Sequence, residues 1–169
     1  MNKRRILFIL ILLLLSSLLG YNYWPEDSLP EDIIAAKLVV HKSQRILELW
    51  SKNEIIKTYK ISLGQNPVGH KEQEGDSKTP EGVYYINDKN PNSQFYLNLG
   101  ISYPNANDKK NAANPGGDIK VHGLRNGIGF IGKLHRLLDW TDGCIAVTNA
   151  EIEELYRTVE IGTPIEIKE

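Results

Sequence analysis

The N-terminal end of the chain carries one continuous block of apolar positions that no polar face interrupts. Residues 6–19 are apolar except for two serines, and they follow a basic stretch at residues 3–5. This length approaches the roughly 20 apolar residues of a membrane-spanning helix, and secretory signals share the basic start. We expect residues 1–24 to be a signal peptide or an N-terminal membrane anchor. Leu18 and Leu19 favour the anchor, because signal cleavage requires small side chains at such positions.

Beyond residue 24 the hydrophobic pattern becomes short and alternating, which is typical of a β-rich domain. Residues 25–36 are polar and contain two prolines, so they indicate a linker. The segments that follow are rich in β-branched and aromatic residues and are separated by turn residues. They predict strands at residues 38–41, 45–50, 54–63, 83–86, 95–99, 119–121 and 165–167.

One helix and two long loops interrupt this strand pattern. Thr148 and Glu151 form a capping box directly before apolar residues at helical spacing, so a helix is expected to begin there. Stretches rich in glycine, proline or asparagine predict loops at residues 64–79 and 104–117. Together these patterns predict a mainly β domain over residues 37–169, with one or two short helices.

Charge and composition exclude several classes of protein. Three of the 20 lysines and arginines lie within residues 1–20, where no acidic residue occurs, so residues 21–169 hold 17 basic and 21 acidic side chains, a net charge of −4. No basic block appears, and nucleic acid is therefore not an expected partner. The four histidines and single cysteine are too widely spread for a zinc site, and we expect neither a metal nor a cofactor.

Cys144 is the only cysteine in the chain, which leaves it without a partner for an internal disulfide. In an exported protein such a thiol is a packed core residue, a site for linkage to another chain, or a nucleophile. Gly143 directly before it favours the nucleophile, because a residue without Cβ lets a reacting carbonyl approach the backbone. The backbone N–H groups of Gly143 and Cys144 are then the natural donors to an oxyanion.

A cysteine nucleophile needs a base, and His122 is the best candidate among the four histidines. Free thiols are largely protonated at neutral pH, and a contacting imidazole can accept the proton. His122 ends a predicted strand next to Gly123, where the backbone can turn its ring towards a loop. His135, His41 and His70 lie instead in a connection, a hairpin and a long loop.

A third group would hold the imidazole in place, and the residues alone leave its identity open. Asp142 and Asp139 both lie near the cysteine in sequence, and a carboxylate suits the orienting role. Asp142 is equally explained as an acceptor for the backbone N–H groups of its own turn.

Three motifs follow one another along the β-rich part of the chain. They are Thr-Pro-Glu-Gly at residues 79–82, a segment ending in Val-His-Gly at residues 116–123, and Thr-Asp-Gly-Cys at residues 141–144. Together they resemble the L,D-transpeptidase family with a YkuD-like catalytic domain, and the likeness covers roughly residues 37–168. The resemblance implies a β-sandwich-like fold of mixed sheets, with the cysteine in a loop that faces a groove. It also implies peptidoglycan stem peptides as the binding partner.

The resemblance further implies a role for each motif residue. Cys144 would be the nucleophile, His122 the general base and acid, and the backbone carbonyl of Gly123 the group that orients the imidazole. Two positions depart from the family pattern, because most members have His where Asp142 stands and many have Arg where Ala146 stands. An aspartate beside a thiolate should raise the pKa of the thiol by like-charge repulsion.

Four residues are our candidates for substrate binding, namely Trp140, Thr141, Asp142 and Tyr103. The aromatic members of strand regions, Tyr103 included, are also explained as sheet core or cross-strand pairs. The spacer between the histidine and the cysteine is long for the family. It therefore predicts an enlarged loop at residues 125–140 that helps to shape the groove.

The main hypothesis is a cell-wall L,D-transpeptidase that acts outside the cytoplasm, since the basic residues 3–5 should remain on the inner side of the membrane. Cys144 would remove the terminal D-residue from a stem tetrapeptide and hold the acyl group as a thioester. An amine would then accept the acyl group, giving a 3-3 crosslink or a protein attachment. Two alternatives remain open: a peptidoglycan L,D-endopeptidase or carboxypeptidase that uses water, and a non-enzymatic, membrane-anchored wall-binding module.

Overall fold

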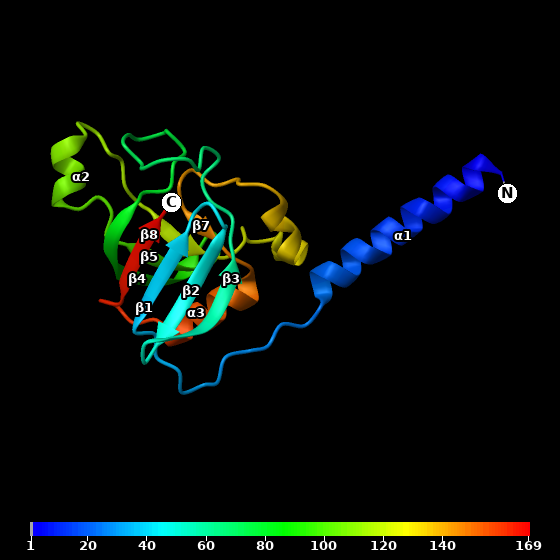
Figure 1. The fold of residues 1–169 in the computed structure, drawn as a ribbon, viewed down its shortest axis with the longest axis horizontal. Coiled ribbons are helices and arrows are strands. Elements are labelled where there is room, and N and C mark those ends of the chain that lie inside the picture. The colour runs from blue at the N-terminus through cyan, green and yellow to red at the C-terminus, as the bar shows by residue number, and fades with distance from the viewer. Residues whose placement is uncertain (1) are drawn as a thin grey trace.

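The computed structural model describes residues 2–169 and combines one long helix with a β-rich body (Figure 1). Helix α1 (Lys3–Tyr23) begins after Asn2, whose side chain accepts a hydrogen bond from the backbone N–H of Arg4. It extends away from the body, and none of its residues is buried. By length and composition, α1 is the one helix within residues 2–169 that is able to cross a membrane, a property that signal sequences share.

Eight strands form one mixed sheet in the order β3-β2-β1-β8-β4-β5-β6-β7. β1 pairs with β8 in parallel, β6 pairs with β7 in parallel, and all other neighbours are antiparallel. The mainly β fold of mixed strand directions expected from the sequence is confirmed. The strands are β1 (Lys37–His41), β2 (Ile46–Ser51), β3 (Glu54–Lys60), β4 (Gly82–Ser93), β5 (Tyr96–Ile101), β6 (Lys120–His122), β7 (Ile145–Ala146) and β8 (Pro164–Lys168).

The sheet curls until its two ends meet. Ser62, just after β3, bridges to Ala146 of β7, and the two backbone N–H···O distances between them are 3.0 and 2.8 Å. A second bridge joins Gly64 to Thr141. These bridges satisfy backbone groups that an edge strand would leave open. They also fix the segment that carries Cys144 between β6 and the chain that follows β3.

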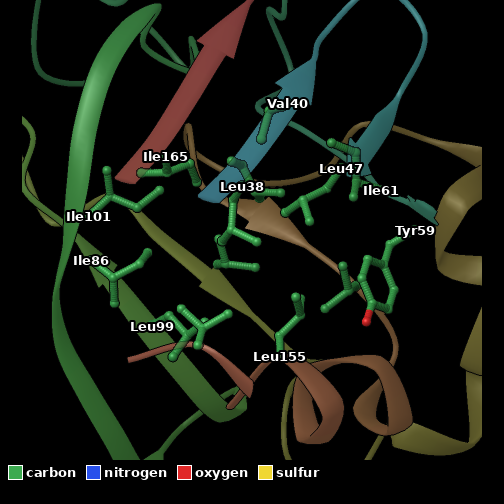
Figure 2. Close-up of a cluster of buried hydrophobic side chains, with 14 of the residues drawn as sticks. Leu38, Val40, Leu47, Tyr59, Ile61, Ile86, Leu99, Ile101, Leu155 and Ile165 are labelled. Atoms are coloured by element: carbon green, nitrogen blue, oxygen red, sulfur yellow. The ribbon is translucent and has the colours of Figure 1, made fainter. Parts of the chain in front are cut away.

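The hydrophobic core lies inside the curl, between the sheet and helix α3 (Asn149–Thr158). Figure 2 shows side chains from β1, β4 and β5 pointing towards Leu155 of α3, among them Leu38, Ile86 and Leu99. All four are fully buried. The periodic apolar positions that predict these strands and this helix are thus the positions that fill the core.

The predicted start of α3 is confirmed. The hydroxyl of Thr148 accepts a hydrogen bond from the backbone N–H of Glu151, and the Glu151 carboxylate accepts one from the N–H of Thr148 at 2.8 Å. This reciprocal cap satisfies N–H groups that have no partner within the helix.

Three elements differ from the sequence-based expectation. β4 continues to Ser93 because polar residues that lack any strand signal pair with β5, as Asn90 does with Asn98. The predicted loop at residues 104–117 contains the short helix α2 (Ala106–Asn111). The expected enlarged loop at residues 125–140 contains η1 (Gly129–Leu137), a 3₁₀ segment that Gly132 divides with a φ of +47°.

Candidate active site

Cys144 and His122 line the same cavity, which has a volume of about 720 Å³. His122 ends β6 and is in register with Ala146 of β7 in the parallel pair. Residues in register on paired strands share a face, and so do residues two apart on one strand. Cys144 stands two residues before Ala146, so its side chain and that of His122 belong to the same face of the sheet.

The His122 ring is held by its neighbours in one tautomer. Its Nδ1 lies 2.7 Å from the carbonyl oxygen of Gly123, which can only accept, so Nδ1 carries the proton and Nε2 is left as an acceptor. The Phe95 ring centroid lies 4.5 Å away, and the Trp140 ring meets the imidazole edge-on at 5.7 Å. Burial lowers the pKa of His122 to about 4, so the ring is neutral at physiological pH.

The Cys144 thiol is half-buried and protonated. Its Sγ lies 3.6 Å from the carbonyl oxygen of Asp118. Burial raises the pKa of Cys144 to about 11, and the carboxylates of Asp118 and Asp142 act in the same direction, whereas Lys120 opposes them. The resting pair is therefore a neutral thiol and a neutral imidazole rather than a thiolate and an imidazolium.

The turn before β7 fixes the position of the thiol. Thr141 Oγ1 donates to the carbonyl oxygen of Cys144 at 2.7 Å and accepts from the N–H of Gly143 at 3.2 Å. Gly143 has a φ of +125°, and a Cβ there would lie 2.5 Å from the carbonyl oxygen of Lys78. Only glycine fits this position, and its N–H, expected from sequence to face an oxyanion, is donated to Thr141. The N–H of Cys144 is engaged by no hydrogen bond among residues 2–169.

Neither nearby carboxylate orients the imidazole. Asp139 accepts three hydrogen bonds from Arg45, the shortest at 2.8 Å, and so stabilises the turn between β1 and β2. Asp142 is exposed at the cavity, where Gln65 Nε2 lies 3.4 Å from its Oδ1. The group that contacts Nδ1 of His122 is therefore the backbone carbonyl of Gly123 rather than a carboxylate.

A family model described as the L,D-transpeptidase catalytic domain (YkuD) matches residues 35–167. The chain belongs to the L,D-transpeptidase family. Among its relatives is YafK of Escherichia coli strain K12, provisionally named an L,D-transpeptidase, with 30% identity over 126 residues. That match covers 71% of this chain and 45% of YafK, so the chain spans about half the length of this relative.

Solved structures place the domain in the same family of folds. The helical cell shape determining protein Pgp2 from Campylobacter jejuni superposes with a TM-score of 0.64 and 28% identity, over 82% of this chain and 49% of Pgp2. The L,D-transpeptidase LdtMt1 in complex with imipenem superposes with a TM-score of 0.52 and 18% identity, over 79% of this chain and 59% of that protein. At 18% identity, the similarity to LdtMt1 shows only that the two proteins share a fold.

Three of the four residues expected to bind substrate line the cavity of this L,D-transpeptidase domain, namely Trp140, Thr141 and Asp142. The structure does not bring the fourth, Tyr103, to the cavity. Its side chain is buried outside the cavity lining, and its hydroxyl donates to the carbonyl oxygen of Pro115 at 2.9 Å. Tyr103 therefore belongs to the core, which is the alternative that its position in an aromatic strand region allowed.

Part of the cavity lining is formed by polar residues that the sequence analysis missed. They come from the end of β4, from the connection that follows it and from β5, where Asn98 is in register with His122. No local signal identifies them, because their proximity to the thiol depends on strand register. These residues are Asn90, Asn92, Ser93, Gln94 and Asn98.

The other three histidines of the transpeptidase domain do not line the cavity. His135 is buried beside it, and the Trp140 indole N–H donates to its Nδ1 at 3.4 Å. His41 lies 3.5 Å from the Glu48 carboxylate. His70 Nδ1 accepts from a backbone N–H at 3.0 Å. The choice of His122 from sequence is thus consistent with where the structure puts all four rings.

Proposed function

We propose that this chain is a cell-wall L,D-transpeptidase in which Cys144 is the nucleophile and His122 is the general base and acid. One observation carries the proposal: the thiol and an imidazole with its Nε2 left as an acceptor share one cavity. Family membership supports the same chemistry.

In the first half-reaction the Cys144 thiol attacks the carbonyl carbon of the L-centre of a diamino acid, at its bond to a terminal D-residue. The thiol proton moves to Nε2 of His122 as the S–C bond forms, because neither group is charged at rest. The tetrahedral oxyanion then collapses, the C–N bond breaks, and His122 returns the proton to the departing amine. The product is a thioester on Cys144 and a free D-amino acid.

In the second half-reaction the amine of an acceptor attacks the thioester carbonyl, in place of the D-amino acid that has left. His122 accepts a proton from the attacking nitrogen, the S–C bond breaks, and the thiol is restored with that proton. An amine from a neighbouring stem peptide gives a 3-3 crosslink, whereas an amine on a protein gives an attachment. Water in place of the amine would give the endopeptidase or carboxypeptidase reaction.

Backbone groups support both half-reactions. The N–H of Cys144 is the first donor that we assign to the oxyanion. The N–H of Gly143 joins it when its 3.2 Å hydrogen bond to Thr141 is shared or released. Gly123 acts as a positioning residue, because its carbonyl fixes the imidazole tautomer. Trp140, Thr141 and Asp142 are the substrate-binding residues of the proposal.

We further propose that the catalytic domain, residues 37–169, is held at the outer side of the cytoplasmic membrane. Residues 1–24 would form the anchor and residues 25–36 the linker. The apolar run of residues 6–19 within α1, and the absence of buried residues from this helix, support this arrangement. An anchor near the membrane would keep the cavity within reach of the growing wall.

Intact-mass analysis of the full chain with a carbapenem tests the nucleophile and its base together. The wild type should gain the mass of one carbapenem, Cys144→Ala should gain none, and His122→Asn should gain it far more slowly. His41→Ala is the matched control, because this imidazole lies outside the cavity, and it should react like the wild type. An undiminished adduct in His122→Asn would remove His122 from the mechanism.

Incubation of the full chain with a purified disaccharide-tetrapeptide identifies the acceptor. Crosslinked dimers indicate transfer, whereas a tripeptide product alone indicates hydrolysis. Absence of both, with the carbapenem adduct still formed, would contradict the proposed substrate.

A further inference from the structure

The segment that holds η1 presents an apolar surface to solvent. Phe130, Leu137 and Leu138 are 69%, 70% and 74% exposed, and Ile128 beside them is also exposed. Beyond residue 24, these are four of the ten exposed large apolar side chains of the described chain. Exposed apolar residues are normally scattered singly over a protein surface, so four of them within residues 128–138 indicate an interaction surface.

The other side of η1 is fixed to the domain. His135 is buried, and Arg136 forms an ion pair with the buried carboxylate of Glu151 at 2.6 Å. Polar and buried contacts on one side, with apolar side chains exposed on the other, make η1 amphipathic. The apolar residues are therefore displayed on an anchored segment.

The same segment is joined to the end of α1. The Asn22 side-chain amide donates to the carbonyl oxygen of Phe130 at 3.2 Å. Lys133 donates to the carbonyl oxygen of Trp24 at 2.7 Å and forms an ion pair with Glu26 at 2.7 Å. Figure 1 shows η1, in yellow, on the side of the body that faces the end of α1. The chain thus leaves its apolar helix in direct contact with η1.

We propose that Ile128, Phe130, Leu137 and Leu138 form a membrane-contact surface that enters the interfacial region of the bilayer spanned by α1. This inference rests on the part of the proposed function that makes α1 an anchor. The bilayer is the occupant because the hydrogen bond from Asn22 to Phe130, with the contacts of Lys133 to Trp24 and Glu26, holds η1 where a membrane-spanning α1 would emerge.

The chemistry of the surface fits this occupant. Amphipathic segments with Phe and Leu on one side lie in the plane of the interface, and their binding grows with the apolar area that they bury. The aromatic residues at the end of α1 belong to the same zone, where tyrosine and tryptophan are enriched. A second contact beside the anchor would hold the catalytic domain in one orientation instead of letting it turn freely on residues 25–36.

Fluorophore labelling of the full chain in lipid vesicles tests this surface. Cys144→Ser removes the only native thiol, and Phe130→Cys or Leu138→Cys then carries an environment-sensitive label. We expect blue-shifted emission, quenching by nitroxide-labelled lipids and loss of quenching by aqueous iodide at both positions. Ile161→Cys is the matched control, since Ile161 is 64% exposed between α3 and β8, and its label should be quenched by iodide.

A label at Leu12→Cys, in the middle of α1, separates the possible failures. Iodide quenching at Phe130 and Leu138 with Leu12 shielded would overturn the membrane-contact surface and leave the anchor intact. Iodide quenching at Leu12 as well would overturn both. Neither result touches the acyl transfer at Cys144, which the carbapenem adduct tests independently.

Discussion

Iodoacetamide should alkylate Cys144 slowly at neutral pH. The pKa of the thiol is raised to about 11 and the pKa of His122 is lowered to about 4, in both cases mainly because burial disfavours charge. The difference of seven units between these pKa values opposes proton transfer by roughly 10 kcal/mol. Attraction between two unit charges placed about 4 Å apart would recover roughly 4 kcal/mol at an effective dielectric constant of about 20. The neutral pair is therefore favoured by roughly 6 kcal/mol, and a pre-formed thiolate is negligible.

The assay follows the intact mass of the full chain over time at a series of pH values, and the single cysteine makes the readout specific. Only the thiolate reacts, so the rate should rise about tenfold per pH unit from about pH 6 to pH 10. His122→Asn should give nearly the same dependence of rate on pH, because the neutral imidazole does not stabilise a thiolate in the resting site. Fast alkylation with a plateau near neutral pH, lost in His122→Asn, would refute the neutral pair and establish a resting ion pair.

Three further predictions concern stability and the turn that carries the thiol. The free energy of unfolding should fall by about 3 kcal/mol from His122 alone as the pH drops from about 6.5 to 4, because only the unfolded imidazole is protonated in that window. Denaturant midpoints that do not change with pH would contradict this. Thr141→Val removes two hydrogen bonds of the turn, so it should destabilise the chain by about 1–3 kcal/mol and slow carbapenem acylation. Thr141→Ser keeps the hydroxyl and should retain wild-type stability and acylation rate. Gly143→Ala would bring a Cβ within 2.5 Å of the Lys78 carbonyl oxygen and should abolish the adduct; acylation at the wild-type rate would disprove the tight fit of this turn.

Features encoded by neighbouring residues could be predicted from the sequence. The capping box of Thr148 and Glu151 requires only residues three apart, and the structure forms it as predicted. The motif residues Cys144 and His122 line one cavity because His122 ends β6 and Cys144 directly precedes β7, and these two strands pair in parallel. Local patterns of this kind do not depend on how the sheet closes.

Features that depend on distant pairing could not be predicted. Asn98 reaches the cavity through its register with β6, and no pattern within its own segment indicates this. Tyr103, expected at the cavity from the sequence, is buried in the core. An aromatic residue in a groove wall and one in a buried core have the same local sequence signals. The contact of Asn22 with Phe130 joins residues 108 positions apart, so the position of η1 beside α1 is visible only in three dimensions.

The central claim is that the Cys144 sulfur becomes acylated by a stem peptide, and an acid-quenched intact mass of the full chain after mixing with disaccharide-tetrapeptide tests it most directly. The account predicts that the wild type gains the mass of the disaccharide-tripeptide acyl group while one D-amino acid is released, and that Cys144→Ala shows neither change. Release of the D-amino acid at an equal rate by Cys144→Ala, with no adduct on the wild type, would contradict it.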